Sequence, residues 1–231
     1  MKFNQDLAIV TLARRHKRFL ADVIDKNGQK LTVHCPNTGS MLGCRQPGSR
    51  AAISRSDNPA RRYLYTLEMV RENDAWAGVN TARANHLVAE ALLAGVVDGF
   101  GPSWQIQREV AAGDGNRLDF CLRRGSEAVY LEVKNCSLAV AGRAFFPDAV
   151  TERGRRHLDS LIRLKKAGYG AVIFFLVQRG DAHEFAPADH IDPDYGQALR
   201  RAAASGVAVM AYGCAVSPKG IEVIRALPCI L

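Results

Sequence analysis

Short apolar runs with a period of two residues fill the first third of the chain. Turn residues such as Lys26-Asn27-Gly28 and Gln46-Pro47-Gly48 separate these runs. The pattern predicts strands at residues 7–12, 18–24, 30–34, 50–54 and 63–70. The number and spacing of these strands favour a small barrel like the five-stranded OB fold.

The pattern changes near residue 80, where Asn80-Thr81 resembles a helix cap. Apolar residues then recur at helical spacing over 86–97. The further elements that we expect are a strand at 104–110, a hairpin at 116–134, helices at 150–167 and 194–204, and strands at 169–178 and 207–216. The sequence therefore predicts an α/β (α+β) protein with a barrel over residues 1–80 and a mixed α/β domain over residues 81–231.

Three charged residues interrupt the apolar hairpin. The two-residue period places Glu132 and Lys134 on one face of the second strand, and Asp119 stands between apolar neighbours in the first. Burial of such charges costs several kcal/mol unless they are paired or bind a metal. Two carboxylates that hold Mg²⁺ or Mn²⁺ beside a lysine suit phosphodiester hydrolysis. The pattern is short, and an ion-pair cluster on a solvated face is an equally good interpretation.

Residues on the flanking elements are further candidates for the same site. Glu90 borders the apolar stripe of the preceding helix, either as a third carboxylate or as a boundary residue that reaches water. Arg153 and His157 are four residues apart and project together, either to grip a phosphate or as part of a solvated face. Gln178, polar at the end of an apolar strand, points to the same cleft.

The net charge of +8 and a pI near 9.4 favour a polyanionic partner. Residues 1–80 carry most of the excess, with 13 Lys and Arg against 7 Asp and Glu. OB folds bind nucleic acid through such a basic surface combined with aromatic stacking platforms. The residues that we expect to contact nucleic acid are Arg14, Arg15, Lys17, Arg18, Arg61, Arg62, Arg153 and His157. No major-groove recognition helix is evident, so we expect contacts mainly to phosphate, weak sequence preference and steep salt dependence.

Two features of the barrel have alternative interpretations. For Phe19, Tyr63 and Tyr65 we favour positions in the barrel core over roles as stacking platforms. The turn Asn37-Thr38-Gly39-Ser40 either offers backbone N–H groups to a phosphate or is an Asx turn and nothing more.

The six cysteines are scattered without a C-x-x-C pair, which indicates neither a zinc site nor a disulfide scaffold. The N-terminal segment lacks the apolar stretch of a signal peptide, and the apolar run at 171–177 is too short to cross a bilayer. We therefore expect a cytoplasmic protein without a membrane partner. The oligomeric state stays open, a dimer included.

A set of segments runs nearly end to end through the chain: Arg18-Phe19-Leu20, His34-Cys35-Pro36-Asn37-Thr38-Gly39, Asn80-Thr81, Asn85, Arg117-Leu118-Asp119-Phe120, Leu131-Glu132-Val133-Lys134-Asn135, Phe146-Pro147-Asp148-Ala149, Arg153-Gly154 and His157-Leu158. In these segments the chain resembles the sugar fermentation stimulation protein A (SfsA) family of bacteria and archaea. The resemblance implies an N-terminal OB fold followed by a PD-(D/E)xK nuclease-like domain. It also implies a DNA-binding protein linked to genes for the use of sugars such as maltose.

The resemblance implies individual roles as well. Asp119 and Glu132 would be the metal carboxylates, Lys134 the catalytic lysine and Glu90 the acid of the first helix. Leu118 stands where the motif has Pro, a residue that contributes no catalytic atom. The leading interpretation is thus a weakly sequence-specific protein that binds DNA, single-stranded DNA included, and has an Mg²⁺ or Mn²⁺ site. The alternative is an active metal-dependent endonuclease or exonuclease. A third, a sugar-binding or metabolic enzyme, rests on the family's name alone.

Overall fold

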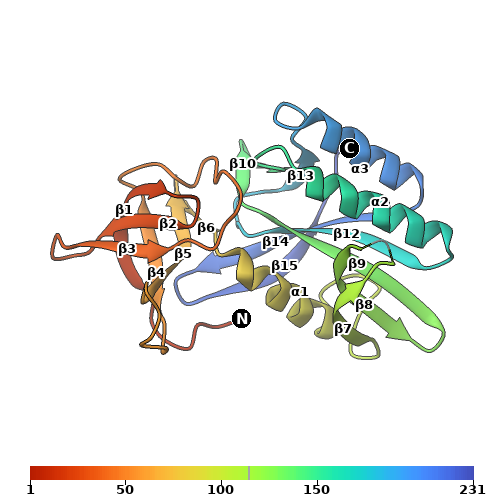
Figure 1. Ribbon diagram of the computed structural model, residues 1–231, viewed down its shortest axis with the longest axis horizontal. Helices are drawn as coiled ribbons and strands as arrows, with labels where there is room; N and C mark the ends of the chain where they lie inside the picture. The colour runs from red at the N-terminus through yellow and green to blue at the C-terminus, as the bar shows by residue number, and fades with distance from the viewer. Residues whose placement is uncertain (114) are drawn as a thin grey trace.

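The structure is a computed structural model that describes residues 1–113 and 115–231. A small barrel lies at one end of the molecule, and a larger mixed sheet with its helices lies at the other (Figure 1). The barrel strands are β1 (Ala8–His16), β2 (Leu20–Ile24), β3 (Lys30–His34), β4 (Arg50–Arg55), β5 (Tyr65–Glu72) and β6 (Ala75–Gly78). They pair in the order β3-β2-β1-β4-β5-β6, and a bridge between His34 and Thr66 joins β3 to β5. The sheet thus closes on itself, as the turn spacing predicts.

Alternating side chains of these strands fill the barrel. Leu12, Val23, Val33 and Leu67 are buried in its core. The strand predicted at 7–12 continues to His16. Strand β6 was not predicted, because it has four residues and no alternating pattern marks it.

The remainder of the chain forms the sheet domain, with the strand order β15-β14-β12-β9-β8-β7 in its larger sheet. Its elements are η1 (Thr81–Arg83), α1 (Ala84–Leu93), β7 (Gln105–Ala111), β8 (Arg117–Arg124), β9 (Glu127–Cys136), α2 (Glu152–Lys166), β12 (Gly170–Val177), α3 (Pro193–Ala204), β14 (Ala208–Ser217) and β15 (Gly220–Leu227). A smaller sheet has the order β10-β11-β13 and consists of β10 (Leu138–Val140), β11 (Arg143–Phe146) and β13 (Glu184–Pro187).

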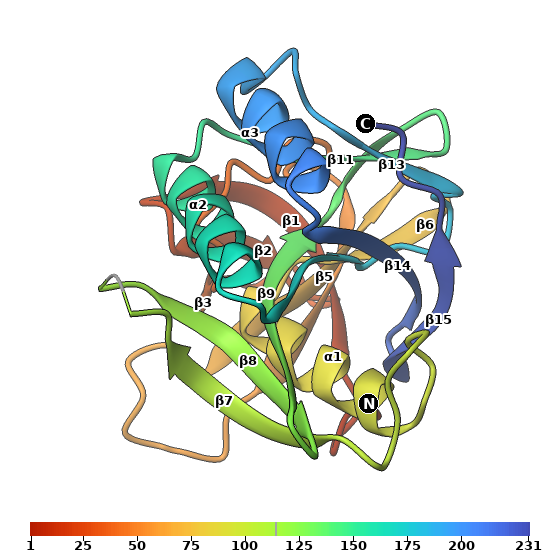
Figure 2. The same ribbon diagram turned by 90° about the vertical axis from the view of Figure 1, so that its right-hand side faces the viewer.

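Strand β12 separates two hydrophobic cores. Ile173 and Phe175 pack among residues of α2 and α3, whereas Phe174 and Leu176 pack among residues of α1. The helices therefore cover both faces of the larger sheet, with α1 on one side and α2 and α3 on the other (Figure 2). This arrangement confirms the predicted class, a barrel followed by a mixed α/β domain.

Some predicted elements differ from the structure. Helix α1 ends at Leu93, not at 97, because Gly95 adopts a left-handed φ of +72° and ends the helix. Strand β15 is absent from the predicted elements, although Ile221 and Val223 are buried in alternation with exposed residues. The short strands β10, β11 and β13 carry too few residues for a clear period.

Arg179 joins the barrel to the sheet domain. It follows the end of β12 and is only 2% exposed. Its Nη1 contacts the Glu72 carboxylate of the barrel and donates to the Ser137 carbonyl at 3.0 Å, while Nε donates to Asp181 at 2.9 Å. Burial alone would lower the pKa of Arg179, but Asp181 and Glu72 raise it above its ordinary value. The guanidinium therefore stays charged and ties the two domains together.

Arg179→Met is expected to lower the free energy of unfolding by about 3 kcal/mol, because it leaves carboxylates unpaired around a buried position. Chemical denaturation at neutral pH measures this loss. The matched control is Arg143→Met, since Arg143 pairs with Glu184 at 2.6 Å and 44% of its side chain is exposed. The control should lose at most about 1 kcal/mol. Equal losses in the two variants would contradict the role of Arg179.

Candidate active site

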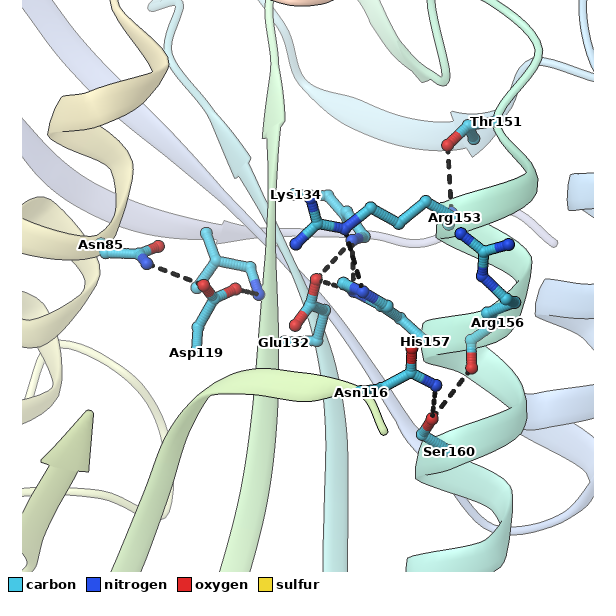
Figure 3. A network of polar contacts seen from close by, with 12 residues as sticks. Asn85, Asn116, Asp119, Glu132, Lys134, Thr151, Arg153, Arg156, His157 and Ser160 are labelled. Atoms are coloured by element: carbon cyan, nitrogen blue, oxygen red, sulfur yellow. Dashed lines mark hydrogen bonds and ion pairs between the residues drawn. The ribbon is translucent and has the colours of Figure 1, made fainter. Parts of the chain in front are cut away.

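The hairpin of β8 and β9 brings two carboxylates together between α1 and α2 (Figure 3). Strands β8 and β9 pair as far as Phe120 and Leu131, and Asp119 and Glu132 follow directly beyond this pair. Leu118 packs with residues of α2 and α3 whereas Phe120 packs with residues of α1, so the two-residue alternation is broken at Asp119. Helix α1 supplies one neighbour of the two carboxylates and helix α2 supplies another. The predicted juxtaposition of Asp119, Glu132 and Lys134 is present in the structure.

Asp119 is held by two donors. Asn85 Nδ2 donates to Oδ1 at 2.7 Å, and the Val133 backbone N–H donates to Oδ2 at 2.7 Å. Burial, followed by the charge of Glu132, raises the pKa of Asp119 from 3.8 to about 6. Two buried carboxylates that repel each other in this way are the kind of groups that could hold a cation.

Glu132 is 3% exposed and carries two partners on a single oxygen. Lys134 Nζ lies 2.5 Å from Oε1, and His157 Nδ1 contacts the same oxygen. Burial raises the pKa of Glu132, but Lys134 and His157 together lower it below its ordinary value. The other oxygen, Oε2, is buried and has no hydrogen-bond partner among the described residues. Glu132 is therefore an ionised carboxylate with one oxygen available to a ligand.

These groups line a cavity of about 440 Å³. Its walls come from the β1–β2 turn and residues 37–39 of the barrel, from the start of α1, from β8 and β9, from residues 145–150 and from the first turns of α2. Both domains therefore contribute to the surroundings of the carboxylates.

Glu90, expected as a third carboxylate, does not belong to this cavity. More than half of its side chain is exposed, and Oε2 lies 2.9 Å from the Met1 amine. Glu90 lies five positions after Asn85, so the two side chains point in directions roughly 140° apart around the helix axis. Asn85 is the residue of α1 that reaches Asp119. An apolar stripe marks the buried face of a helix but does not tell which bordering polar residue faces a site.

The residues of α2 divide between the interior and the rim. His157, expected to grip phosphate, is only 4% exposed and lies 3.1 Å from Lys134 Nζ, inside the carboxylate cluster. Arg153 is exposed at the cavity wall, and its Nε donates to His157 Nε2 at 3.3 Å. Gln178 is fully buried behind the site and contacts Asn135, which lines the cavity.

The basic residues of the barrel have different partners. Arg14 pairs with Asp22 at 2.7 Å, and Arg15 donates to the carbonyls of Asn37 and Arg18, each at 2.7 Å. Arg62 lies over the Tyr63 ring, and Arg61 reaches the Thr66 hydroxyl at 3.3 Å. Lys17 is exposed, and Arg18 lines the cavity. Of this set, Arg18 alone extends into the wall of the carboxylate cavity.

The aromatic residues and the 37–40 turn also have defined places. Tyr65 packs against the barrel core, whereas Phe19 is 43% exposed, so the core position favoured for Phe19 is wrong. Asn37 Oδ1 accepts from the Gly39 N–H at 2.8 Å, which makes the turn an Asx turn. The same turn lines the cavity.

Comparisons with known proteins agree with this two-part organisation. A family model described as "SfsA N-terminal OB domain" matches residues 13–79, and one described as "Sugar fermentation stimulation protein RE domain" matches residues 82–220. The chain belongs to the sugar fermentation stimulation protein family. This confirms the resemblance seen in the sequence.

Members of the sugar fermentation stimulation protein family match over almost their whole length. The homolog from Desulfotalea psychrophila is 49% identical over 231 residues, covering 100% of this chain and 95% of the relative. The homolog from Pelobacter propionicus is 51% identical over 221 residues, covering 96% of each. A solved structure described as "The structure of Pyrococcus Furiosus SfsA in complex with Ca2+" has a TM-score of 0.92 at 23% identity, covering 100% of this chain and 98% of that one. It shows that the fold is shared.

Other expectations concern metal ligands, thiols and membranes. In residues 1–113 and 115–231, no three His, Cys, Asp or Glu side chains are grouped so that they could hold a metal ion by themselves. All six cysteines are free. Within the same residues, no helix combines the length and the apolar character needed to cross a membrane.

The raised pKa of Asp119 predicts how the stability of the metal-free protein depends on pH. A carboxyl whose pKa is higher in the folded state stabilises the fold below its unfolded pKa, and this contribution is lost as the pH rises through the folded pKa. This contribution of Asp119 is therefore lost between pH 3.8, its ordinary pKa, and about pH 6, its pKa in the folded protein. Urea denaturation in EDTA from pH 4 to pH 7 should therefore show Asp119→Asn gaining stability relative to the parent as the pH rises. A difference between parent and variant that stays constant across this window would contradict the shift.

Proposed function

We propose that the protein binds DNA with weak sequence preference and that Asp119 and Glu132 hold Mg²⁺ or Mn²⁺ for hydrolysis of phosphodiester bonds. The observation that carries this proposal is the buried Oε2 of Glu132, which lacks a hydrogen-bond partner among the described residues and lies beside a second carboxylate. A buried charged oxygen without a partner is costly, and a bound cation removes that cost.

The donor set fits a small, hard cation. Mg²⁺ is commonly bound by one or two carboxylates, with waters and substrate phosphates completing its coordination. Asp119 and Glu132 supply such a pair, so three protein carboxylates are not required. The Pyrococcus furiosus structure is described as a complex with Ca²⁺, which supports a divalent ion in this fold. When bound, such an ion polarises the phosphate and lowers the pKa of a coordinated water.

The surrounding side chains hold the carboxylates and supply positive charge. Asn85 and the Val133 N–H orient Asp119, while His157 packs against Glu132 from α2. Lys134 is 12% exposed at its side chain and carries an ammonium group beside Glu132. This group stabilises the negative charge that develops on the phosphoryl oxygens, or positions the attacking water.

Metal binding should be visible as a gain in stability. We expect Mg²⁺ or Mn²⁺ to raise the melting temperature of the parent protein, with a gain of about 2.7 kcal/mol at a metal concentration one hundred times the Kd. Glu132→Gln and Asp119→Asn should abolish the gain, because each removes a ligand charge. Glu90→Gln is the control and should retain it, since Glu90 lies outside the cavity. A gain that survives Glu132→Gln would place the metal elsewhere.

Hydrolysis is tested with a panel of single-stranded, duplex and branched DNA together with RNA, in Mg²⁺ or Mn²⁺ and in EDTA. We expect cleavage only with the metal, and a loss of at least about a hundredfold in Glu132→Ala and Lys134→Ala. Glu90→Ala should cut like the parent. The hydrolytic part of the proposal fails if no substrate is cut, or if Glu132→Ala is as active as the parent.

A second candidate function is DNA binding without hydrolysis of the DNA. The excess of Lys and Arg in residues 1–80 favours it, because phosphate contacts alone give binding without chemistry. The names of the relatives refer to sugar fermentation. A protein of this kind would affect sugar use by binding DNA at the genes concerned. Binding that persists in EDTA, falls steeply with salt and is never followed by cleavage would favour this function.

A further inference from the structure

We propose that nucleic acid reaches the carboxylates as a single strand, not as a duplex. This inference rests on the proposed function and names the class of substrate. It comes from residues 36–41 of the barrel, here called the barrel bridge, of which residues 37–39 form part of the wall of the cavity in the sheet domain.

The barrel bridge is fixed to the sheet domain at one end of the cavity. The Met41 N–H donates to Asp148 Oδ2 at 2.7 Å, and the Ser40 hydroxyl donates to the Asp148 carbonyl. Gly39 lies so close that a Cβ atom there would be 2.4 Å from Asp148 Oδ1. No space for a strand of nucleic acid exists between the barrel bridge and Asp148.

The barrel bridge is also fixed at its other end. The Thr81 hydroxyl donates to the Pro36 carbonyl at 2.6 Å, and Asn37 Nδ2 donates to the Val79 carbonyl at 3.0 Å. From the barrel side, Arg15 donates to the Asn37 carbonyl at 2.7 Å. Contacts on three sides therefore hold this wall against the cavity.

The reactive groups lie inside this enclosure. Glu132 is 3% exposed, and the Lys134 side chain is 12% exposed. The cavity of about 440 Å³ is of the size that takes one small ligand. A phosphodiester must therefore enter the protein to reach Glu132 and Lys134.

In most complexes with duplex DNA, the protein inserts an element of its own into the major groove, which is about 12 Å wide, and the DNA does not enter the protein. In a duplex each backbone is tied to its partner strand along its whole length. A single strand can turn one phosphate into the cavity, whereas the paired strand would meet the barrel bridge. The enclosure therefore selects a single-stranded end, tail or loop.

A second cavity, with a volume of about 510 Å³, shares Ala82 of its lining with the first. Its lining includes Arg55, Arg61 and His34 of the barrel. Glu68, also in this lining, is neutralised by Arg83 at 2.8 Å. Within the described part of the chain, Arg18, Arg55 and Arg61 form no ion pair, so their charges are available to phosphates along the strand.

The experiment compares oligonucleotides of one sequence as a single strand, a blunt duplex and a duplex with a single-stranded tail. Binding is measured by fluorescence anisotropy in Ca²⁺, and cleavage is measured in Mg²⁺ or Mn²⁺. We expect the single strand to bind at least about ten times more tightly than the blunt duplex. Cuts in the tailed duplex should fall in the tail and stop near the junction.

Two variants test whether the bound single strand of nucleic acid passes beside the barrel bridge. Arg18→Ala should weaken single-strand binding several-fold and reduce its salt slope by about one, as expected for the loss of one phosphate contact. Arg50→Ala is the matched control, because Arg50 is an exposed arginine of the same barrel that lines neither cavity. Equal effects of the two variants would contradict the path.

The outcomes separate this inference from the proposed function. If the blunt duplex is bound and cut as well as the single strand, the inference is wrong while the proposed function stands. If none of the nucleic acids is bound or cut, the proposed function fails and the inference fails with it.

Discussion

The buried charge of Glu132 determines how the sheet domain is assembled. A carboxylate at 3% exposure is tolerated only because Lys134 and His157 compensate it on one oxygen. Because His157 belongs to α2, the same compensation sets where that helix docks on β9. Asp119 likewise helps to set the position of α1, because Asn85 of that helix donates a hydrogen bond to it. Both helices are thus positioned by the polar site as well as by the hydrophobic cores on the two faces of the sheet.

The site remains incomplete in electrostatic terms. Glu132 keeps an oxygen without a partner among the described residues, and the pKa of Asp119 is raised by burial and by its neighbour. A protein that only needed stability would gain from an apolar pair at these positions. The arrangement makes sense for a site that gains its missing positive charge with a ligand, and the fold provides the rigid surroundings that such a site needs.

Sequence reasoning finds the features that depend on local periodicity. The two-residue period of the hairpin is enough to place Glu132 and Lys134 on one face of β9. The position of Asp119 beside them also depends on a break in the alternation between Leu118 and Phe120, which no local pattern marks. The same reasoning selects Glu90, which borders the apolar stripe, and misses Asn85, because the predicted helix begins at residue 86 whereas α1 begins at Ala84. It also assigns His157 to the surface. The contacts of Arg15 and Arg179 join residues far apart in sequence, and no local pattern marks them.

The close contact between Gly39 and Asp148 restricts the substitutions that this chain tolerates. Any side chain at residue 39 would collide with the carboxylate, and Asp148 in turn accepts from the Met41 backbone. Each half of the molecule therefore restricts which residues the other half can carry. A change confined to the barrel, such as a methyl group at residue 39, would therefore displace residues of the sheet domain, and the two domains are not mechanically independent although they look separable.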